Sequence, residues 1–189
     1  MMRLCITGCS RSGTGWIAEF CRRSGLDIGH EKVRADGVAG WMWTMPEIEA
    51  RSEFGLILHQ VREPLATIGS TMTHRAKVWE HVEKVIGPLP KDNALLRSAF
   101  YWIRWNIVSE ALASWTYRVE EIRPGTATMS EWSARTGIVI PSPFPDVPRN
   151  LNARRHPCVR PSDFAEYPET WQQIRALSAR YGYSIEVTQ

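Results

Sequence analysis

The first residues of the chain constrain its fold more than any other stretch: a short apolar run, a turn of small residues and a helical pattern. Leu4, Cys5 and Ile6 form the run, the turn extends over 8–15, and apolar residues recur at helical spacing from Ile17. A strand that leads through such a turn into a helix leaves backbone N–H groups unpaired at the positive end of the helix dipole. Turns of this kind bind phosphate and sulfate esters. The stretch therefore predicts an anion site after the first strand.

Strands and helices alternate along the rest of the chain. We expect strands over 3–7, 26–31, 54–61 and 117–119, an edge strand over 183–187, and helices over 14–24, 65–86, 93–114, 129–136 and 162–180. The stretches 32–47 and 138–161 have the composition of loops. Alternation of this kind predicts an α/β protein, a three-layer α/β/α fold with a central parallel sheet. No domain boundary is evident, so we expect a single domain over residues 1–189.

Polar residues follow the ends of several predicted strands. They are the turn 8–15, the pair His30 and Glu31, Arg62, and the pair 120–121. Because the carboxyl ends of parallel strands meet at one edge of a sheet, we expect these residues to converge there.

The composition excludes several classes of protein. The 189 residues are 43% hydrophobic and 23% charged, as in ordinary soluble domains. The formal charge of +3 is too small to indicate nucleic-acid binding by itself, but it suits a site for a small polyanion. No apolar run approaches the ~20 residues of a membrane span. Met1 leads directly into the first strand, so we expect a cytoplasmic protein with no signal peptide and no membrane partner.

The four cysteines indicate a reducing compartment. Cys5, Cys9, Cys21 and Cys158 lack the spacing of a zinc site. The first three fall in the first strand, turn and helix, where we expect buried thiols.

The first turn has the spacing of a nucleotide P-loop without its lysine. Thr14 stands where a Lys should follow Gly13 to reach the terminal phosphates of ATP. Arg11 still offers a cation within the turn. The missing Lys weakens the hypothesis of a P-loop nucleotide or small-molecule kinase. Two other hypotheses are a non-catalytic phosphonucleotide-binding protein and a turn that binds no ligand.

The turn resembles the phosphosulfate-binding loop of the sulfotransferases that use 3′-phosphoadenosine 5′-phosphosulfate (PAPS). The common form in that family is Pro-Lys-Ser-Gly-Thr-Thr-Trp; here Arg11 takes the place of the Lys, and Ser10 and Gly15 differ. The resemblance implies a P-loop nucleoside-triphosphate-hydrolase-like fold, PAPS as the co-substrate and no metal. It also implies that the donor is bound by Arg11, Ser12, Gly13, Thr14, Gly15 and Trp16.

A second element of the same family is present at the end of the strand 54–61. Sulfotransferases hold the 3′-phosphate of PAPS with an Arg at a strand end and a Ser eight residues later, which is the separation of Arg62 and Ser70. Arg62 supplies a fork of donors for a phosphate, and Ser70 adds a hydroxyl about two helical turns on. The competing interpretations are a surface ion pair of Arg62 with Glu63 and a bond of Ser70 to its own helix backbone.

Softer similarity to bacterial, carbohydrate-type sulfotransferases covers 29–41, 102–106 and 117–120. The late Arg-Lys-Gly motif of the cytosolic members is missing. Asn152, Arg154 and Arg155 offer a substitute in the long loop, and a solvated basic loop is the competing interpretation.

Sulfuryl transfer needs an in-line arrangement, stabilisation of the developing charge and a base for the acceptor proton. Arg11 and the N–H groups of the turn suit the stabilisation of the developing charge. Sulfotransferases use a Glu or His as the base, and the related carbohydrate-type enzymes have a Glu in this region. We therefore assign the base to Glu31, with His30 as the second candidate. Side chains alternate along an extended chain, so we expect only one of the two to face the site.

Tryptophans close to the proposed base suggest where the acceptor binds. Trp41 and Trp43 follow Glu31, and aromatic faces suit the rings of a carbohydrate or another small-molecule acceptor. Packing in the core is the competing interpretation for both. Trp102, Trp105 and His59 are expected in the core.

Overall fold

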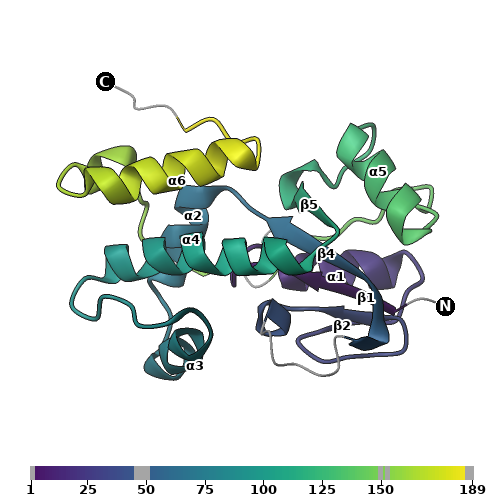
Figure 1. Ribbon diagram of the computed structural model, residues 1–189. Coiled ribbons are helices and arrows are strands. Elements are labelled where there is room, and N and C mark those ends of the chain that lie inside the picture. The colour runs from purple at the N-terminus through teal and green to yellow at the C-terminus, as the bar shows by residue number, and fades with distance from the viewer. Residues whose placement is uncertain (1–2, 45–51, 149–150, 152–153, 186–189) are drawn as a thin grey trace.

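A five-stranded parallel sheet forms the centre of the molecule (Figure 1). The computed structural model describes residues 3–44, 52–148, 151 and 154–185. The strands follow the order β2-β3-β1-β4-β5 across the sheet. Their bounds are Arg3–Thr7 (β1), Ile28–His30 (β2), Gly37–Ala39 (β3), Phe54–Val61 (β4) and Trp115–Arg118 (β5). The α/β class and the parallel sheet that the sequence predicts are therefore confirmed.

Helices cover both faces of the sheet. On one face lie α1 (Thr14–Arg23) and α5 (Ala127–Thr136), which pack around the buried ring of Phe20. On the other lie α2 (Pro64–Thr71), α4 (Ala94–Leu112) and α6 (Pro168–Arg180). Figure 1 shows α4 running across the sheet with α2 and α6 beside it, and α3 (Ala76–Ile86) at its flank. Among the elements with described bounds are the short 3₁₀ turns η1 (Trp41–Thr44), η3 (Val119–Glu121) and η4 (Pro161–Phe164).

Side chains alternate along β4, so this strand contributes residues to the hydrophobic cores on both faces of the sheet. Leu58 joins the α1 side, whereas Val61 joins the α4 side. His59 also faces α4, where its ring nitrogens lie 3.1 Å from Asn106 Oδ1 and 3.1 Å from Thr116 Oγ1. Burial lowers the pKa of His59 to about 4, so this histidine is a neutral part of the core, as predicted. Trp102 and Trp105 of α4 are buried as well, as expected.

Three predicted elements differ from the structure. The predicted helix 65–86 is two helices, because the chain turns at 72–75 and the Thr73 hydroxyl bonds to the Ser70 carbonyl. The predicted loop 32–47 contains β3, which is too short for a periodic signal. Gly37 starts this strand, because a Cβ there would lie 1.9 Å from the Leu4 carbonyl oxygen. Residues 183–185 form no strand, and 186–187 lie outside the described residues.

The expectation of buried thiols in the first strand, turn and helix is confirmed. Cys5, Cys9 and Cys21 are buried, whereas Cys158 is exposed. Within the described ranges, no helix combines the length and apolar character of a membrane span.

Candidate functional site

The turn after β1 is shaped by three residues with unusual backbone demands. Gly8 allows the turn to touch β4, because a Cβ at this position would lie 2.2 Å from the Gln60 carbonyl oxygen. Arg11 and Gly13 adopt the left-handed region, with φ of 70° and 91°. Helix α1 begins directly afterwards, with no side-chain cap and no acidic residue in its first turn. Its N-terminal N–H groups and dipole therefore face the turn, as an anion site requires.

Neighbouring elements hold this turn through polar contacts that the sequence pattern does not reveal. Gln60 of β4 donates from Nε2 to the Ser12 carbonyl at 2.7 Å, and Tyr117 of β5 donates to Gln60 Oε1 at 2.8 Å. The backbone N–H of Ser10 donates to the Tyr101 hydroxyl of α4 at 3.0 Å. The one signal in the sequence is Gln60 itself, which with His59 is a polar residue in a largely apolar run.

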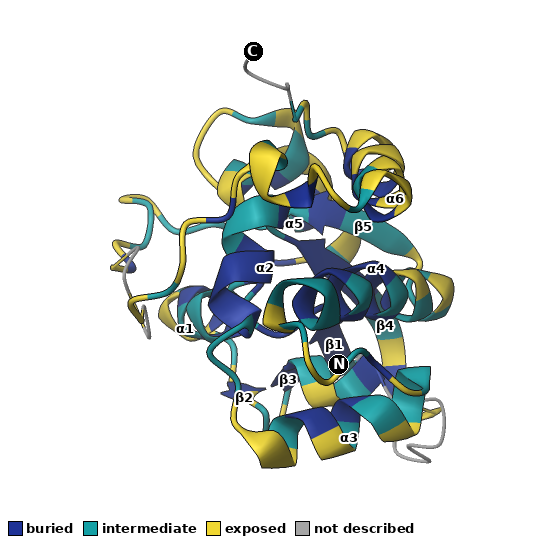
Figure 2. Ribbon diagram, turned by 90° about the vertical axis from the view of Figure 1, so that its left-hand side faces the viewer, coloured by how far each residue is buried: buried dark blue, intermediate teal, exposed yellow. Residues whose placement is uncertain are grey.

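The structure brings Arg62 to this turn. Its Nη1 donates to the carbonyl oxygen of Arg11 at 3.1 Å. Glu63 does not compete for it as an ion-pair partner, because its carboxylate accepts from the N–H groups of Leu65 and Ala66 and caps α2. Ser70 lies on the same helix and is buried; Figure 2 shows most of α2 in the dark blue of buried residues. The predicted convergence of Arg62 with the turn 8–15 is confirmed.

Two buried polar atoms in the turn have no hydrogen-bond partner among the described residues. They are Ser12 Oγ and Arg11 Nε. Ser12 is only 1% exposed. Buried polar atoms in native proteins are almost always paired, since leaving one unpaired costs about 1–3 kcal/mol. Both atoms are donors, so they are available to an anion at the turn; other buried atoms of the described residues, such as Ser98 Oγ and Trp132 Nε1, are without a partner as well.

The late loop adds a further cation. Burial, and next the charge of Arg154, lower the pKa of Arg11. The segment after Arg154 packs on α2, where a Cβ at Gly69 would lie 2.3 Å from the Pro157 carbonyl oxygen. Arg154 and Arg155 are both exposed, and Asn152 lies outside the described residues. The role of the two arginines as a substitute for the missing late motif stays a prediction.

His30 and Glu31 lie together at the end of β2. His30 Nε2 is 3.3 Å from Thr14 Oγ1 and 3.6 Å from Glu31 Oε1. The contact with Thr14 places the His30 ring at the turn, whereas the Glu31 carboxylate accepts from the Trp41 N–H, and which of the two faces the site stays a prediction. Glu31 adopts the left-handed region, with φ of 59°.

The carboxyl group of Glu31 is poised to exchange a proton near neutral pH. Burial raises its pKa to about 7, partly offset by hydrogen bonds from the N–H groups of Trp41 and Met42. Oε1 accepts the Trp41 N–H at 3.2 Å, while Oε2 is buried without a partner among the described residues. Gly40 leaves the space for this group, since a Cβ there would lie 2.4 Å from Oε2. Burial and the charge of Arg22 lower the pKa of His30, which favours its neutral form.

The two predicted acceptor tryptophans occupy different clusters. Trp41 packs on Trp105, with ring centroids 5.3 Å apart, and Trp43 packs edge-on against Phe54 at 5.5 Å. Both remain partly exposed. The structure does not bring them together on one surface. Trp16 donates to the Val147 carbonyl and stacks on Phe20, while keeping a partly exposed face beside the turn.

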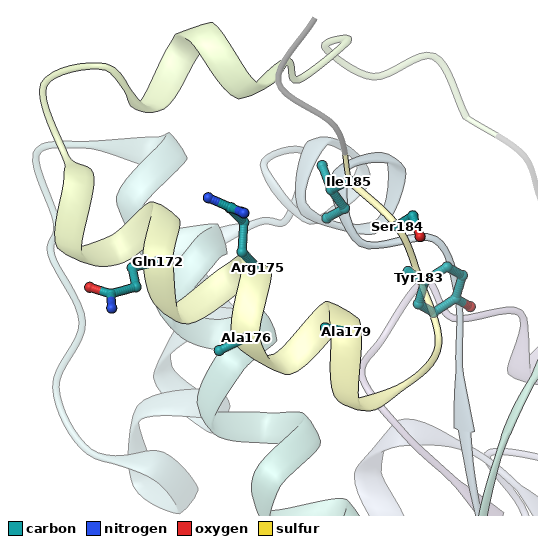
Figure 3. Close-up of a pocket in the computed structure, with 7 residues that line it drawn as sticks. All are labelled: Gln172, Arg175, Ala176, Ala179, Tyr183, Ser184 and Ile185. Atoms are coloured by element: carbon teal, nitrogen blue, oxygen red, sulfur yellow. The ribbon is translucent and has the colours of Figure 1, made fainter.

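A separate groove of about 580 Å³ lies between α6 and the segment that follows it (Figure 3). Arg175 and Tyr183 are among its lining residues, which include none of the predicted site residues. In the described part of the chain, no group of three His, Cys, Asp or Glu side chains could hold a metal ion.

Comparison with protein-family models, with curated proteins and with solved structures finds no significant match to this chain.

Proposed function

We propose that this protein is a PAPS-dependent sulfotransferase with a P-loop-like turn. The observation that carries the proposal is the meeting of two phosphate-binding elements far apart in sequence. Arg62 bonds to Arg11, and beside this bond Ser12 Oγ and Arg11 Nε lack partners among the described residues. A donor with two separate anionic groups explains why both elements point to one edge of the sheet.

In the proposed complex, the turn binds the 5′-phosphosulfate. The N–H groups at the start of α1, the hydroxyls of Ser12 and Thr14, and the Arg11 guanidinium supply donors for its oxygens. Arg62 and Ser70 bind the 3′-phosphate, which ATP lacks. Arg154, whose charge acts on Arg11, would add positive charge to the site.

The reaction follows from this placement. The acceptor hydroxyl attacks the sulfur in line with the departing oxygen, a new S–O bond forms, and adenosine 3′,5′-bisphosphate leaves. Arg11 and the turn N–H groups stabilise the negative charge that develops on the sulfuryl and leaving oxygens.

Glu31 accepts the hydroxyl proton in this scheme. Its pKa of about 7 suits a general base at neutral pH. His30 is the second candidate, since its ring lies between Thr14 and Glu31. The acceptor class stays a small molecule or carbohydrate with a free hydroxyl, and Trp41 is the aromatic surface nearest to Glu31 along the chain.

Calorimetry without Mg²⁺ tests the donor. Adenosine 3′,5′-bisphosphate should bind, and ATP and adenosine 5′-phosphate should bind far more weakly. Equal affinity for ATP and the bisphosphate would instead favour a nucleotide kinase, and the sulfotransferase proposal would be abandoned.

A screen with radiolabelled PAPS tests the reaction over a panel of sugars, phenols and other hydroxyl acceptors. Glu31→Gln should preserve bisphosphate binding and suppress transfer. If transfer survives in Glu31→Gln but not in His30→Ala, His30 is the base. Bisphosphate binding without transfer to any acceptor would favour a phosphonucleotide-binding protein.

A further inference from the structure

The turn between α2 and α3 brings a histidine against the anion-binding turn. His74 Nε2 lies 2.6 Å from Ser10 Oγ, and the backbone N–H of Ser10 is held by the Tyr101 hydroxyl. Ser10 directly precedes Arg11 and Ser12, each of which has a buried polar atom without a partner among the described residues. A direct hydrogen bond therefore joins His74 to the anion-binding turn.

The surroundings of His74 are positive and aromatic. The rings of Trp79 from α3 and Tyr101 from α4 pack against it, with centroids 5.5 and 6.3 Å away. Burial keeps Tyr101 neutral by raising its pKa. Arg11 of the turn and Arg154 of the late loop are the charged groups that act on the His74 ring, and no described carboxylate is among them. Burial and these two arginines lower the pKa of His74 to about 4, so the ring is neutral while the turn is empty.

We propose that His74 is a positioning residue that takes up a proton from solvent when a dianion binds to the turn. The imidazolium then donates from Nε2 to Ser10 Oγ, which frees the Ser10 hydroxyl hydrogen to point at the anion. The inference rests on the proposed function for the identity of that anion, the phosphosulfate or phosphate of the donor. The placement of His74, Ser10 and the two arginines carries the rest.

The reason for proton uptake is electrostatic. A bound dianion offsets the charges of Arg11 and Arg154 and adds an attraction of its own. An opposite charge within about 4–6 Å of a titratable group shifts its pKa by about 1–3 units. The pKa of His74 is then higher in the complex than in the free protein. The associated gain in affinity is present below the pKa of the complex and disappears as the pH rises through it.

The variant His74→Gln separates the hydrogen bond from the proton, because a Gln amide can bond Ser10 but cannot be protonated. With a rise of about two units in the pKa of His74, wild type should bind adenosine 3′,5′-bisphosphate about tenfold more tightly than His74→Gln at about pH 5, and equally at about pH 7.5. The ligand phosphate also titrates near ~6, so the ratio between the two proteins is the quantity to compare. His81→Gln on α3 is the matched control and should keep the wild-type profile.

NMR titration of the His74 ring in the wild-type protein measures the same effect directly. The ring pKa should rise on adding the bisphosphate, and also on adding inorganic sulfate, which stays a dianion throughout. If the bisphosphate binds and the pKa of His74 stays where it was, the inference is overturned and the proposed function stands. If the bisphosphate fails to bind but sulfate raises the pKa, the proposed function fails and His74 keeps its role. If the bisphosphate does not bind and neither ligand moves the pKa of His74, both are rejected.

Discussion

Arg62 donates a hydrogen bond from Nη1 to the carbonyl oxygen of Arg11 at 3.1 Å. The bond joins the end of β4 to the turn after β1, two segments that are distant in sequence. A guanidinium carries five N–H donors, so one bond to the backbone fixes its place and leaves others for a ligand. The bond therefore leaves Arg62 free to hold the 3′-phosphate beside the turn, as we propose.

Arg62→Ala should abolish the preference for a 3′-phosphate. Charge-assisted hydrogen bonds contribute about 1.5–3 kcal/mol, so adenosine 3′,5′-bisphosphate should bind about 10- to 100-fold more weakly. Adenosine 5′-phosphate should bind as it does to wild type, and calorimetry with both ligands gives the ratio. An unchanged ratio would remove Arg62 from the site.

Ser12→Ala should make the empty protein more stable and the site weaker. The hydroxyl of Ser12 is buried without a partner among the described residues, so its removal should raise the free energy of unfolding by about 1 kcal/mol. The same change removes a donor for the anion. Urea unfolding and bisphosphate titration measure the two effects. Lower stability of Ser12→Ala would mean that the hydroxyl already has a partner.

Glu31→Gln should change how stability depends on pH. The folded pKa of about 7 lies above the ordinary ~4.3, so the folded state holds a proton that the unfolded state has released. The stability of wild type should therefore fall between about pH 4 and pH 7, by up to about 3 kcal/mol. The variant lacks this loss and should be the more stable protein at about pH 8, whereas the two should differ less at about pH 5.

Urea unfolding at the two pH values gives this comparison. Glu131→Gln, at an exposed position of α5, serves as the control and should follow wild type. The same fall in stability in Glu31→Gln and in wild type would show that the Glu31 carboxyl does not cause it.

Gln60→Leu should destabilise the turn 8–15, because Gln60 holds this turn from the neighbouring strand β4. The substitution removes the donor to the Ser12 carbonyl and leaves the Tyr117 hydroxyl without its acceptor, at an expected cost of about 1–3 kcal/mol. Bisphosphate affinity should fall as well. Tyr117→Phe keeps the Gln60–Ser12 bond and should retain more of the affinity. Equal losses in the two variants would argue against a role of that bond in shaping the turn.

Much of the fold could be predicted from the sequence because its main signals are local. The buried run of β4 matches the predicted bounds, and Asn93 caps α4 through a bond to the Leu96 N–H. The break between α2 and α3 contains no glycine or proline that would signal it in the sequence. It carries instead a hydrogen bond from the Thr73 hydroxyl to the Ser70 carbonyl. Strand β3 depends on its neighbours, β1 and β2, which no local pattern reveals.

The candidate site likewise has parts that the sequence predicts and parts that it does not. The turn 8–15 and Arg62 could be found from spacing, because strand ends of a parallel sheet converge. The left-handed backbone of Glu31 could not, because the sequence has no glycine at this position to signal it. His74 could not be found either, because its link to Ser10 joins a helix break to a distant loop.

The strand order has a consequence for folding. Because β1 lies between β3 and β4, the segments that carry Arg11, His30 and Arg62 meet only once the sheet has formed. The unfolded chain does not hold these three segments together, so we expect the proposed ligand to bind the native state alone. Binding should then stabilise the fold by an amount that grows with the ratio of ligand concentration to Kd, about 2.7 kcal/mol at one hundred times Kd. A rise in melting temperature with ligand concentration is therefore a direct measure of affinity, even before an acceptor is known.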